Sequence, residues 1–422
     1  MTTTTLQIQT DIYTSRTRQR VMGILFLLMA FIIWGFLGRS VPAGTITTFG
    51  MTPGGIDATI GDWELPALAT MNTLALLSAM LGGYQLARGF GSRTNLLLGV
   101  VAVFFIFSFL TWAAAGKSLN LVGLLNSSLS KAVPIALGAM SGLLCERAGV
   151  VNIAIEGMML SGAMMGALIA SLTQNLWMGV LAAMLTGALL ALVHAIFSIK
   201  YMIDQIISGT VINIFSVGIT SYISAKFLQV YQELNNPGIF KPWAMPILSD
   251  IPIIGPIIFN NNMFVYATFI FLAAIHVALF YTRWGLRLRA VGEHPRAADT
   301  LGINVFRTRY MAVILGGMMA GFGGAYFTLG SVGRFDEMMT AGRGFIGLAA
   351  MIFGNWKPFG AFGAGLLFGF ADSLASKLAI LGISIPSQFL LMAPYVATMI
   401  VLAGIVGRGQ MPAADGQPYV KE

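Results

Sequence analysis

The sequence has few charged residues and almost no cysteine. Of its 422 residues only 9% are charged, whereas soluble domains carry about 25%. The single cysteine, Cys145, cannot form an intramolecular disulfide, which excludes a disulfide-bridged ectodomain. The three histidines are far apart in the sequence, and neither an H-E-x-x-H motif nor a nucleophile elbow is present. These absences exclude an ordinary soluble globule and argue against the common metal-dependent and serine hydrolases.

Long hydrophobic runs dominate the chain instead. Hydrophobic residues make up 57% of it, and runs of roughly 18 to 25 residues are long enough to cross a hydrocarbon core of about 30 Å as helices. We therefore predict an all-α, polytopic transmembrane helical bundle of about 10–12 membrane segments, including discontinuous helices. The expected spans are 21–38, 65–87, 95–115, 121–145, 150–171, 175–199, 203–226, 263–282, 308–330, 359–380 and 386–407.

One apolar segment, 344–355, is too short to cross a membrane alone. It is predicted to be half of a broken helix that ends at Trp356-Lys357-Pro358. Segment 147–157 is a second candidate for such a break. Glycines recur at small-xxx-small spacing, which predicts close helix packing in lipid; the pairs are Gly138/Gly142, Gly162/Gly166, Gly317/Gly321 and Gly365/Gly369.

Arginine and lysine predict the orientation of the spans. Basic residues precede the first span, which we expect to be retained with its amino end in the cytoplasm. The arginine-rich segment 283–309 then falls inside, and segments 39–64 and 227–262 fall outside. With 344–355 counted as a crossing, both termini are cytoplasmic. The net charge of +8 is interpreted as basic cytoplasmic loops rather than as a nucleic-acid surface.

Polar residues inside the apolar sequence ERAGVVNIAIEGMM need an explanation. A carboxylate at the centre of a membrane helix costs on the order of 2.5–3.5 kcal/mol, so Glu156 requires a partner or water. On a helix, Asn152 and Glu156 share one face because they are four residues apart. Either they line a water-accessible path or they pair with a neighbouring helix and hold the bundle together; Lys131 is a possible partner for Glu156.

A second polar surface is expected on the span 203–226. At 100° per residue its polar side chains fall within about a third of the helix circumference, and they are Gln205, Ser208, Gly209, Ser216 and Thr220. Such a stripe needs water or a polar partner, although Ser and Thr can also bond to their own backbone.

The basic segment RWGLRLRAVGEHPRAADTLGINVFRTR holds six arginines and two acids. Pro295 suits the first position of a helix and Gly302 supplies a stop, so we predict a two-turn helix over Pro295–Leu301. A short rigid helix between two spans can receive a push from a cytoplasmic motor; the alternative is a loop that only sets topology. The nearest approach to a phosphate loop, TWAAAGKS at 111–118, lacks the first glycine, so any ATP would be bound by another subunit.

Four motifs in the same order carry a family resemblance: ERAGVVNIAIEGMM, MPILSDIPIIGPIIF, GLRLRAVGEHPRAADTLGIN and GRGFIGLAAMIFGNW. They resemble permease subunits of ABC importers, in the family of branched-chain amino acid and ribose permeases, and most of all its nucleoside and simple-sugar branch. The resemblance covers about 120–408. It implies a transport subunit without enzymatic activity of its own, in the cell membrane of a prokaryote. The implied partners are a second permease, often a non-identical one, cytoplasmic ATPases that hold ATP and Mg, and an external substrate-binding lipoprotein; no nucleic acid is implied.

The resemblance also assigns roles to residues. By the resemblance, Asn152, Glu156 and Gly157 would lie along the substrate path. The polar stripe on the span 203–226 adds Gln205, Ser208 and Ser216 as further candidates for this path. Residues 293–302 are similar to the coupling helix that docks on the ATPase; its predicted contacts are Glu293, His294, Pro295, Arg296, Asp299 and Gly302. The proline-containing stretch 237–256 would lie beneath the binding protein.

Typical members of this branch begin near position 119 of this sequence. Residues 1–118, with three candidate spans, therefore resemble an extension to the permease core 119–408, which a cytoplasmic tail, 409–422, follows. The principal alternative function is an ion-coupled secondary transporter in which Glu156 carries the proton. An intramembrane enzyme is disfavoured because no paired catalytic constellation occurs within the spans.

Overall fold

The computed structural model describes residues 16–53, 60–383, 386, 388–389, 391–392 and 411–421. Ten helices in this described part are long and apolar enough to cross a membrane. They coincide, within a few residues, with the ten expected spans between 21 and 380, so the predicted all-α polytopic bundle is confirmed. The remaining expected span, 386–407, lies almost entirely outside the described residues.

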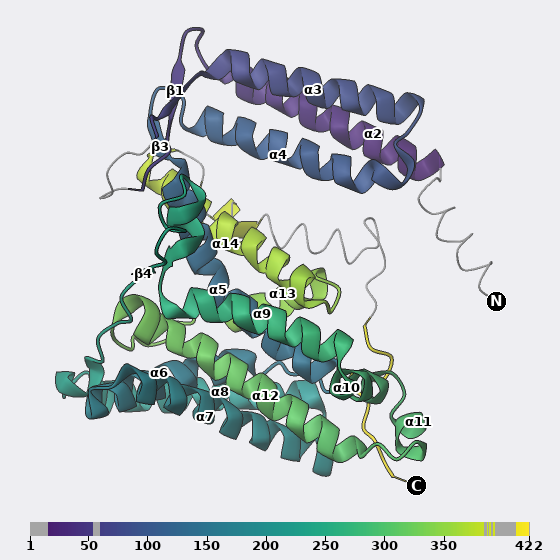
Figure 1. The fold of residues 1–422 in the computed structure, drawn as a ribbon, viewed down its shortest axis with the longest axis vertical. Helices are drawn as coiled ribbons and strands as arrows, with labels where there is room; N and C mark the ends of the chain where they lie inside the picture. Colours follow the sequence, from purple (N-terminus) through teal and green to yellow (C-terminus); the bar gives the residue numbers. More distant parts are fainter. Residues whose placement is uncertain are drawn as a thin grey trace. The chain divides into compact units, whose positions relative to one another are not determined.

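The chain divides into two compact units, which are described separately. The first comprises Met1–Gly123 with Lys377–Ile385, and the second comprises Leu124–Ser376 with Pro386–Glu422. In the described residues of the first unit there are three long helices, α2 (Arg16–Phe31), α3 (Ala67–Ala87) and α4 (Thr94–Ala113). Helix α2 continues through the short turns η1 (Ile32–Leu37) and η2 (Gly38–Ser40), and η3 (Gly91–Arg93) precedes α4. The three helices pack side by side (Figure 1).

A small sheet accompanies these three helices. Strand β1 (Ile46–Gly50) pairs antiparallel with β2 (Trp63–Pro66) and parallel with β3 (Ser118–Asn120). The buried Thr47 hydroxyl donates to the carbonyl oxygen of Thr111 on α4 at 2.9 Å, which ties the sheet to the helices. Our sequence analysis expected only an external segment at 39–64. The parallel partner of β1 is far away in the sequence, so no local pattern predicts the pairing.

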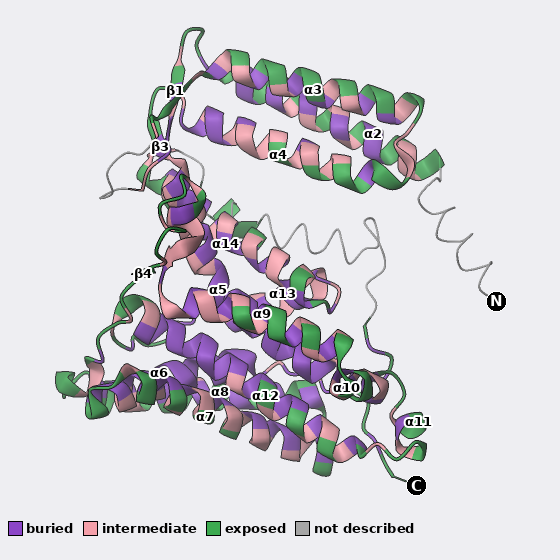
Figure 2. Ribbon diagram, in the orientation of Figure 1, coloured by how far each residue is buried: buried purple, intermediate pink, exposed green. Residues whose placement is uncertain are grey.

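The described residues of the second unit form seven long helices and several short elements. The long helices are α5 (Leu121–Glu146), α6 (Ile155–Thr173), α7 (Leu176–Ala195), α8 (Gln205–Ile223), α9 (Met263–Tyr281), α12 (Val305–Ala325) and α14 (Pro358–Ile380). Three of them continue as π-helical turns: α7 through η4 (Ile196–Lys200), α8 through η5 (Ser224–Leu228) and α12 through η8 (Tyr326–Val332). Between α8 and α9 lie η6 (Gln232–Asn235), β4 (Trp243–Ala244), η7 (Gly255–Phe259) and β5 (Asn260–Asn261). Helices α5, α6 and α12 form the interior of this unit (Figure 2).

Glycine allows the interior helices to approach one another closely. A Cβ atom on Gly187 of α7 would lie 2.1 Å from the carbonyl oxygen of Gly317 on α12. A Cβ atom on Gly162 of α6 would lie 2.9 Å from the Cα atom of Gly321, also on α12. In lipid there is no hydrophobic effect to drive helices together, so their association depends on dispersion attraction between closely packed backbones. The prediction that the glycine pairs serve dense packing is confirmed at these positions.

Helix α13 (Arg343–Phe353) is the predicted half-helix. Its 11 residues span about 16 Å, roughly half of the hydrocarbon thickness of about 30 Å. The helix begins after Gly342, whose φ of 79° few other residues adopt. Beyond its end, the indole Nε1 of Trp356 donates to Glu146 Oε2 at 2.5 Å, and Arg147 Nε donates to the Trp356 carbonyl oxygen at 3.0 Å.

The arginine-rich segment folds into two short helices, α10 (Arg283–Glu293) and α11 (Pro295–Thr300). Helix α11 confirms the predicted two-turn helix over Pro295–Leu301. His294 caps it, because the ring Nδ1 accepts a hydrogen bond from the Ala297 amide at 3.1 Å. Gly302, with φ of 80°, follows its end. Sequence analysis did not predict α10, in which two glycines, Gly285 and Gly292, lower the intrinsic helix propensity.

Candidate functional site

Segment 147–154 is unwound between α5 and α6. The expectation that Asn152 and Glu156 share one helix face is wrong, because α6 begins at Ile155 and Asn152 precedes it. The Asn152 Oδ1 accepts a hydrogen bond from the Ala154 amide at 3.1 Å, which forms a turn instead of another helical residue. The side chain of Asn152 is fully buried, and its amide nitrogen lies 3.4 Å from Cys145 Sγ.

Backbone exposed by this unwinding needs polar partners, since the hydrocarbon core of a membrane supplies none. The Gln205 side chain accepts a hydrogen bond from the Val151 amide at 2.7 Å. The ring of His194 on α7 lies between the Val151 carbonyl oxygen, 2.9 Å from Nε2, and the Ser208 hydroxyl, 3.0 Å from Nδ1. Part of the predicted polar stripe therefore finds a polar partner, which is the unwound segment of the same chain.

Asn213 completes this arrangement from the middle of α8. Its Nδ2 donates to the Ile153 carbonyl oxygen at 2.9 Å, and its Oδ1 accepts from the Gly157 amide at 2.8 Å. The second bond caps α6, whose N-cap residue, Ala154, makes no side-chain cap. Gly157 is required here, because a Cβ atom would lie 2.7 Å from Ser216 Oγ and 2.9 Å from Asn213 Oδ1.

The carboxylate of Glu156 caps the amino end of the half-helix α13. Its Oε1 accepts from the Thr340 hydroxyl at 2.6 Å and from the Gly342 amide at 2.8 Å, and its Oε2 accepts from the Gly344 amide at 2.6 Å. The free amides and the macrodipole at a helix N-terminus stabilise a negative charge. A backbone this close to Glu156 leaves no room for a side chain at position 344, where a Cβ atom would lie 2.6 Å from Glu156 Cα. This cap makes the buried acid tolerable.

The suggested pairing of Lys131 with Glu156 is wrong. Lys131 on α5 forms an ion pair with Asp372 on α14 at 3.0 Å and donates to Ser376 Oγ at 2.7 Å. Asp372 also pairs with Arg343, the first residue of α13, at 2.9 Å. The two cations share one carboxylate, so α13 is held to α14 by charge and to α6 by the Glu156 cap.

A cavity of about 350 Å³ lies beside Glu156. Its lining comes from α6, α8, α13 and the loop that precedes α13: Glu156, Leu160, Asn213, Ile214, Val217, Met338, Thr340, Ala341, Gly342 and Phe345. Most of these side chains are apolar, and three polar ones, Glu156, Asn213 and Thr340, converge on one end of α13. We call this space the inner cavity.

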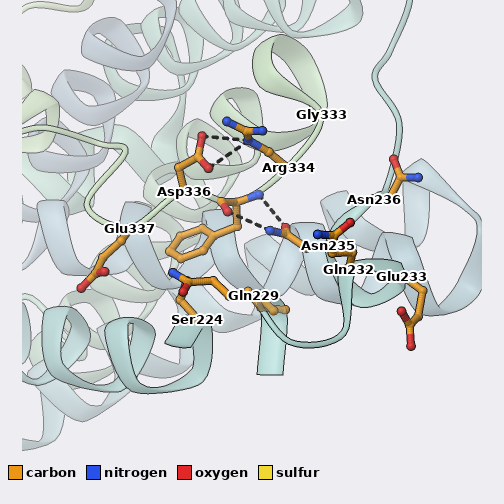
Figure 3. A pocket seen from close by; sticks show the side chains of 12 residues that line it. Ser224, Gln229, Gln232, Glu233, Asn235, Asn236, Gly333, Arg334, Asp336 and Glu337 are labelled. Carbon is orange, nitrogen blue, oxygen red and sulfur yellow. Dashed lines mark hydrogen bonds and ion pairs between the residues drawn. The ribbon is translucent and has the colours of Figure 1, made fainter. Parts of the chain in front are cut away.

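A larger and more polar cavity, of about 610 Å³, lies at the far end of α8 (Figure 3). It is lined by Ser224, Leu228, Gln229, Gln232, Glu233, Asn235, Asn236, Gly333, Arg334, Phe335, Asp336 and Glu337. Asn235 Nδ2 donates to the Phe335 carbonyl oxygen at 2.9 Å, and Asn235 Oδ1 accepts from the Phe335 amide at 2.7 Å. We call this space the outer cavity.

The two cavities share two elements. Residues 333–337 line the outer cavity, and residues 338 and 340–342 of the same loop line the inner one. Val217 on α8 lines the inner cavity, and Ser224, the first residue of its continuation η5, lines the outer one. The two residues are about 10 Å apart along the helix. One loop and one helix therefore border both cavities.

The predicted site residues are distributed over two regions. Glu156 lines the inner cavity, and Gly157 is the next residue of α6. Gln205, Ser208 and Ser216 are buried against segment 147–157. That any of these residues contacts a substrate stays a prediction. Four of the predicted coupling residues line a separate surface cavity of about 440 Å³: Glu293, His294, Pro295 and Arg296. Asp299 lies 3.9 Å from Lys421 Nζ.

Sequence analysis missed Asn213, Thr340, Gly342, Gly344 and Asp372. For Asn213 a signal existed, because the helical period places it at the edge of the polar stripe. The others depend on which segment packs against Glu156 and Lys131. Within the described residues, no group of three or more His, Cys, Asp or Glu side chains is placed to hold a metal ion.

Many apolar helices, an unwound polar-lined segment between them and a half-helix whose amino end receives a carboxylate are typical of membrane transport proteins. The model of the family described as "Branched-chain amino acid transport system / permease component" matches residues 124–406, and the chain belongs to this family. The predicted class, the permease subunit of an ABC importer, is confirmed.

Three relatives are similar over most of their length. The chain is 41% identical over 304 residues to the guanosine ABC transporter permease protein NupQ of Bacillus subtilis, covering 70% of this chain and 95% of NupQ. It is 42% identical over 298 residues to the nucleoside ABC transporter permease protein NupC of Lactococcus lactis, covering 68% and 93%. It is 31% identical over 324 residues to the putative glucose ABC transporter permease protein TsgC13 of Haloferax volcanii, covering 71% and 98%. No solved structure matches the chain.

Proposed function

We propose that this permease carries a nucleoside, with a simple sugar as the second candidate, through the prokaryotic cell membrane. An external substrate-binding lipoprotein delivers the substrate, and cytoplasmic ATPases that bind ATP and Mg drive the transport. Two relatives whose names specify guanosine or nucleosides motivate the first substrate class, and one named for glucose motivates the second.

The inner cavity is the observation that carries this proposal. Its volume of about 350 Å³ falls within the range of about 300–1,000 Å³ that small-molecule sites occupy. A nucleoside combines a planar base with a hydroxylated sugar. The aromatic ring of Phe345 and the side chains of Met338 and Leu160 supply apolar contacts, and Asn213 and Thr340 supply polar ones.

The outer cavity supports a route into the inner one. Its lining is rich in amides and charged side chains, which suit a hydrated solute arriving from water. With the arginine-rich segment in the cytoplasm, η6 and the loop 333–342 fall on the external side. The substrate would then pass from the outer cavity, along α8 and this loop, to the amino end of α13.

A second permease subunit would close the inner cavity. Three residues of its lining are substantially exposed, with exposed fractions of 68% for Ile214, 57% for Met338 and 47% for Phe345. The cavity is thus open along the side of α8. A partner permease on this side, non-identical to this chain, would form the opposite wall of the substrate path.

Coupling to the ATPases is assigned to α11. It is short, polar and capped at both ends, and it lies in the basic segment that the positive-inside rule places in the cytoplasm. The residues proposed to contact the ATPase are Glu293, His294, Pro295, Arg296, Asp299 and Gly302.

The proposal is tested with the assembly purified from its native membrane and reconstituted into vesicles. An ATPase, a second permease and a lipoprotein should co-purify, and uptake of radiolabelled guanosine should require ATP. A panel of unlabelled guanosine, adenosine, ribose and glucose then ranks the substrates by competition.

The ion-coupled alternative predicts a different result in the same assay. Uptake that continues without ATP and stops when an uncoupler collapses the proton gradient would refute the ATP-driven proposal. In that case Glu156 would be the candidate proton carrier.

A further inference from the structure

The carboxy-terminal tail, residues 411–421, makes contacts that the proposed transport cycle leaves unexplained. It has no helix or strand, yet it packs against α10, α11, α12 and segment 147–154. The Ala414 amide donates to the carbonyl oxygen of Gly292 at 2.9 Å, and the Ala413 amide donates to Glu293 Oε2 at 3.2 Å. These bonds attach the tail to the end of α10, directly before α11.

Tyr419 attaches the tail to the helices on both sides of α11. The side chain is 6% exposed and belongs to an apolar cluster with Val291 of α10, Ala298 of α11 and Val305 of α12. Its ring lies 5.4 Å from that of Phe306, centroid to centroid. The neighbouring residue, Val420, is 57% exposed and lies outside this cluster.

The tail also reaches segment 147–154, which leads to Glu156. Gly149 has a φ of 81°, and a Cβ atom on it would lie 3.0 Å from the carbonyl oxygen of Ala414. A Cβ atom on Gly416 would lie 3.4 Å from a methyl carbon of the Val151 side chain. Arg309 is 1% exposed, and its Nη1 donates to the Gln417 carbonyl oxygen at 3.0 Å.

Segment 146–156 in turn holds both ends of the half-helix α13. Glu156 caps its amino end, and Glu146 and Arg147 bind Trp356 beyond its carboxyl end. Gly292 at the end of α10 is packed so closely on this segment that a Cβ atom would lie 2.2 Å from the carbonyl oxygen of Arg147. Contact is therefore continuous from α11 through α10 to both ends of α13.

We propose that the tail is a positioning element that locks α10 and α11 to segment 147–154, so that a movement of α11 reaches Glu156 and the inner cavity. Tyr419 is its principal positioning residue. This inference rests on the proposed coupling role of α11. A tail that only covered the surface would not need a buried aromatic side chain between three helices or close contact at Gly149.

The test measures uptake and ATP hydrolysis together in the reconstituted assembly. In Tyr419→Ala, uptake per ATP hydrolysed should fall roughly 2- to 30-fold, the range that mutations along a coupling path produce. Tyr419→Phe should keep the wild-type ratio because it keeps the ring. Met411→Ala serves as the matched control with no change, because Met411 is a tail residue that is 56% exposed and lies outside both this cluster and the cavity at α11. Equal ratios in Tyr419→Ala and wild type would overturn the proposal.

A cross-link keeps the inference testable if Tyr419→Ala does not assemble. Thr300→Cys, at the exposed residue of α11 next to Asp299, and Lys421→Cys, whose Nζ lies 3.9 Å from Asp299, are joined by a short bismaleimide and so fix the tail to α11. Coupled uptake should persist in the linked protein, since a positioning element stays attached throughout the cycle. Loss of uptake on linking, with recovery in the unlinked double variant, would show that the tail must detach. A wild-type assembly without any ATP-dependent uptake would instead refute the proposed function.

Discussion

The substitution Glu156→Gln tests the role of the carboxylate that caps α13. Glutamine has nearly the same size as glutamate, but its amide nitrogen donates hydrogen bonds and carries no charge. The glutamine oxygen can still accept from Thr340 and Gly342, and its nitrogen then faces the Gly344 amide, which is 2.6 Å from Glu156 Oε2. Two donors would oppose each other at a buried position.

The magnitude follows from two losses. An unsatisfied buried amide costs about 1–3 kcal/mol, and the loss of a negative charge at a partly buried helix N-terminus costs up to about 2 kcal/mol. A total of about 3 kcal/mol would lower the equilibrium constant between the capped and the uncapped α13 by a factor of roughly 100. Since α13 forms one side of the inner cavity, uptake should fall by up to that factor.

The assay is uptake of radiolabelled guanosine by vesicles that hold the purified assembly, with the amount of assembled permease measured in parallel. Glu64→Gln is the matched control, because Glu64 is an exposed acid on β2 in the first unit. Glu156→Asp should retain part of the activity, since the charge remains. Wild-type uptake in Glu156→Gln at equal assembly would refute the role assigned to the cap.

Three further predictions concern packing, charge and pH. Gly344→Ala should abolish uptake because its Cβ atom would lie 2.6 Å from Glu156 Cα, whereas Gly363→Ala, with no atom within 4 Å, should be neutral; equal uptake in the two variants would contradict the close contact. Asp372→Asn leaves two cations without their acid and should lower the melting temperature more than Lys131→Met, which leaves Asp372 paired; equal melting temperatures would count against the shared ion pair. Burial raises the pKa of Asp415 to about 7 from its ordinary 3.8, so the folded protein binds this proton more tightly than the unfolded chain does. The stability that this bound proton contributes is lost as pH rises toward about 7. The melting temperature of wild type relative to Asp415→Asn should therefore fall between about pH 5 and pH 7, and parallel curves would exclude this linkage.

The sequence by itself determined the membrane class, the ten described spans, the half-helix and the short helix at Pro295. Each depends on a local property: the length of an apolar run, a glycine or proline that ends a helix, or a proline that begins one. The same reasoning identified Glu156 as a residue that needed a partner, because a carboxylate in hydrocarbon is costly wherever it lies.

Only the tertiary structure decided what that partner is. Lys131 and the amino end of α13 are both candidate partners for Glu156, and nothing in the sequence shows which of the two lies next to it. Lys131 pairs with Asp372. Glu156 accepts hydrogen bonds from the amides of Gly342 and Gly344, which lie more than 180 residues later in the chain. The unwinding at Asn152 is also a tertiary outcome: a helix would satisfy the same backbone, but His194, Gln205 and Asn213 supply the bonds instead, because packing brings α7 and α8 against this segment.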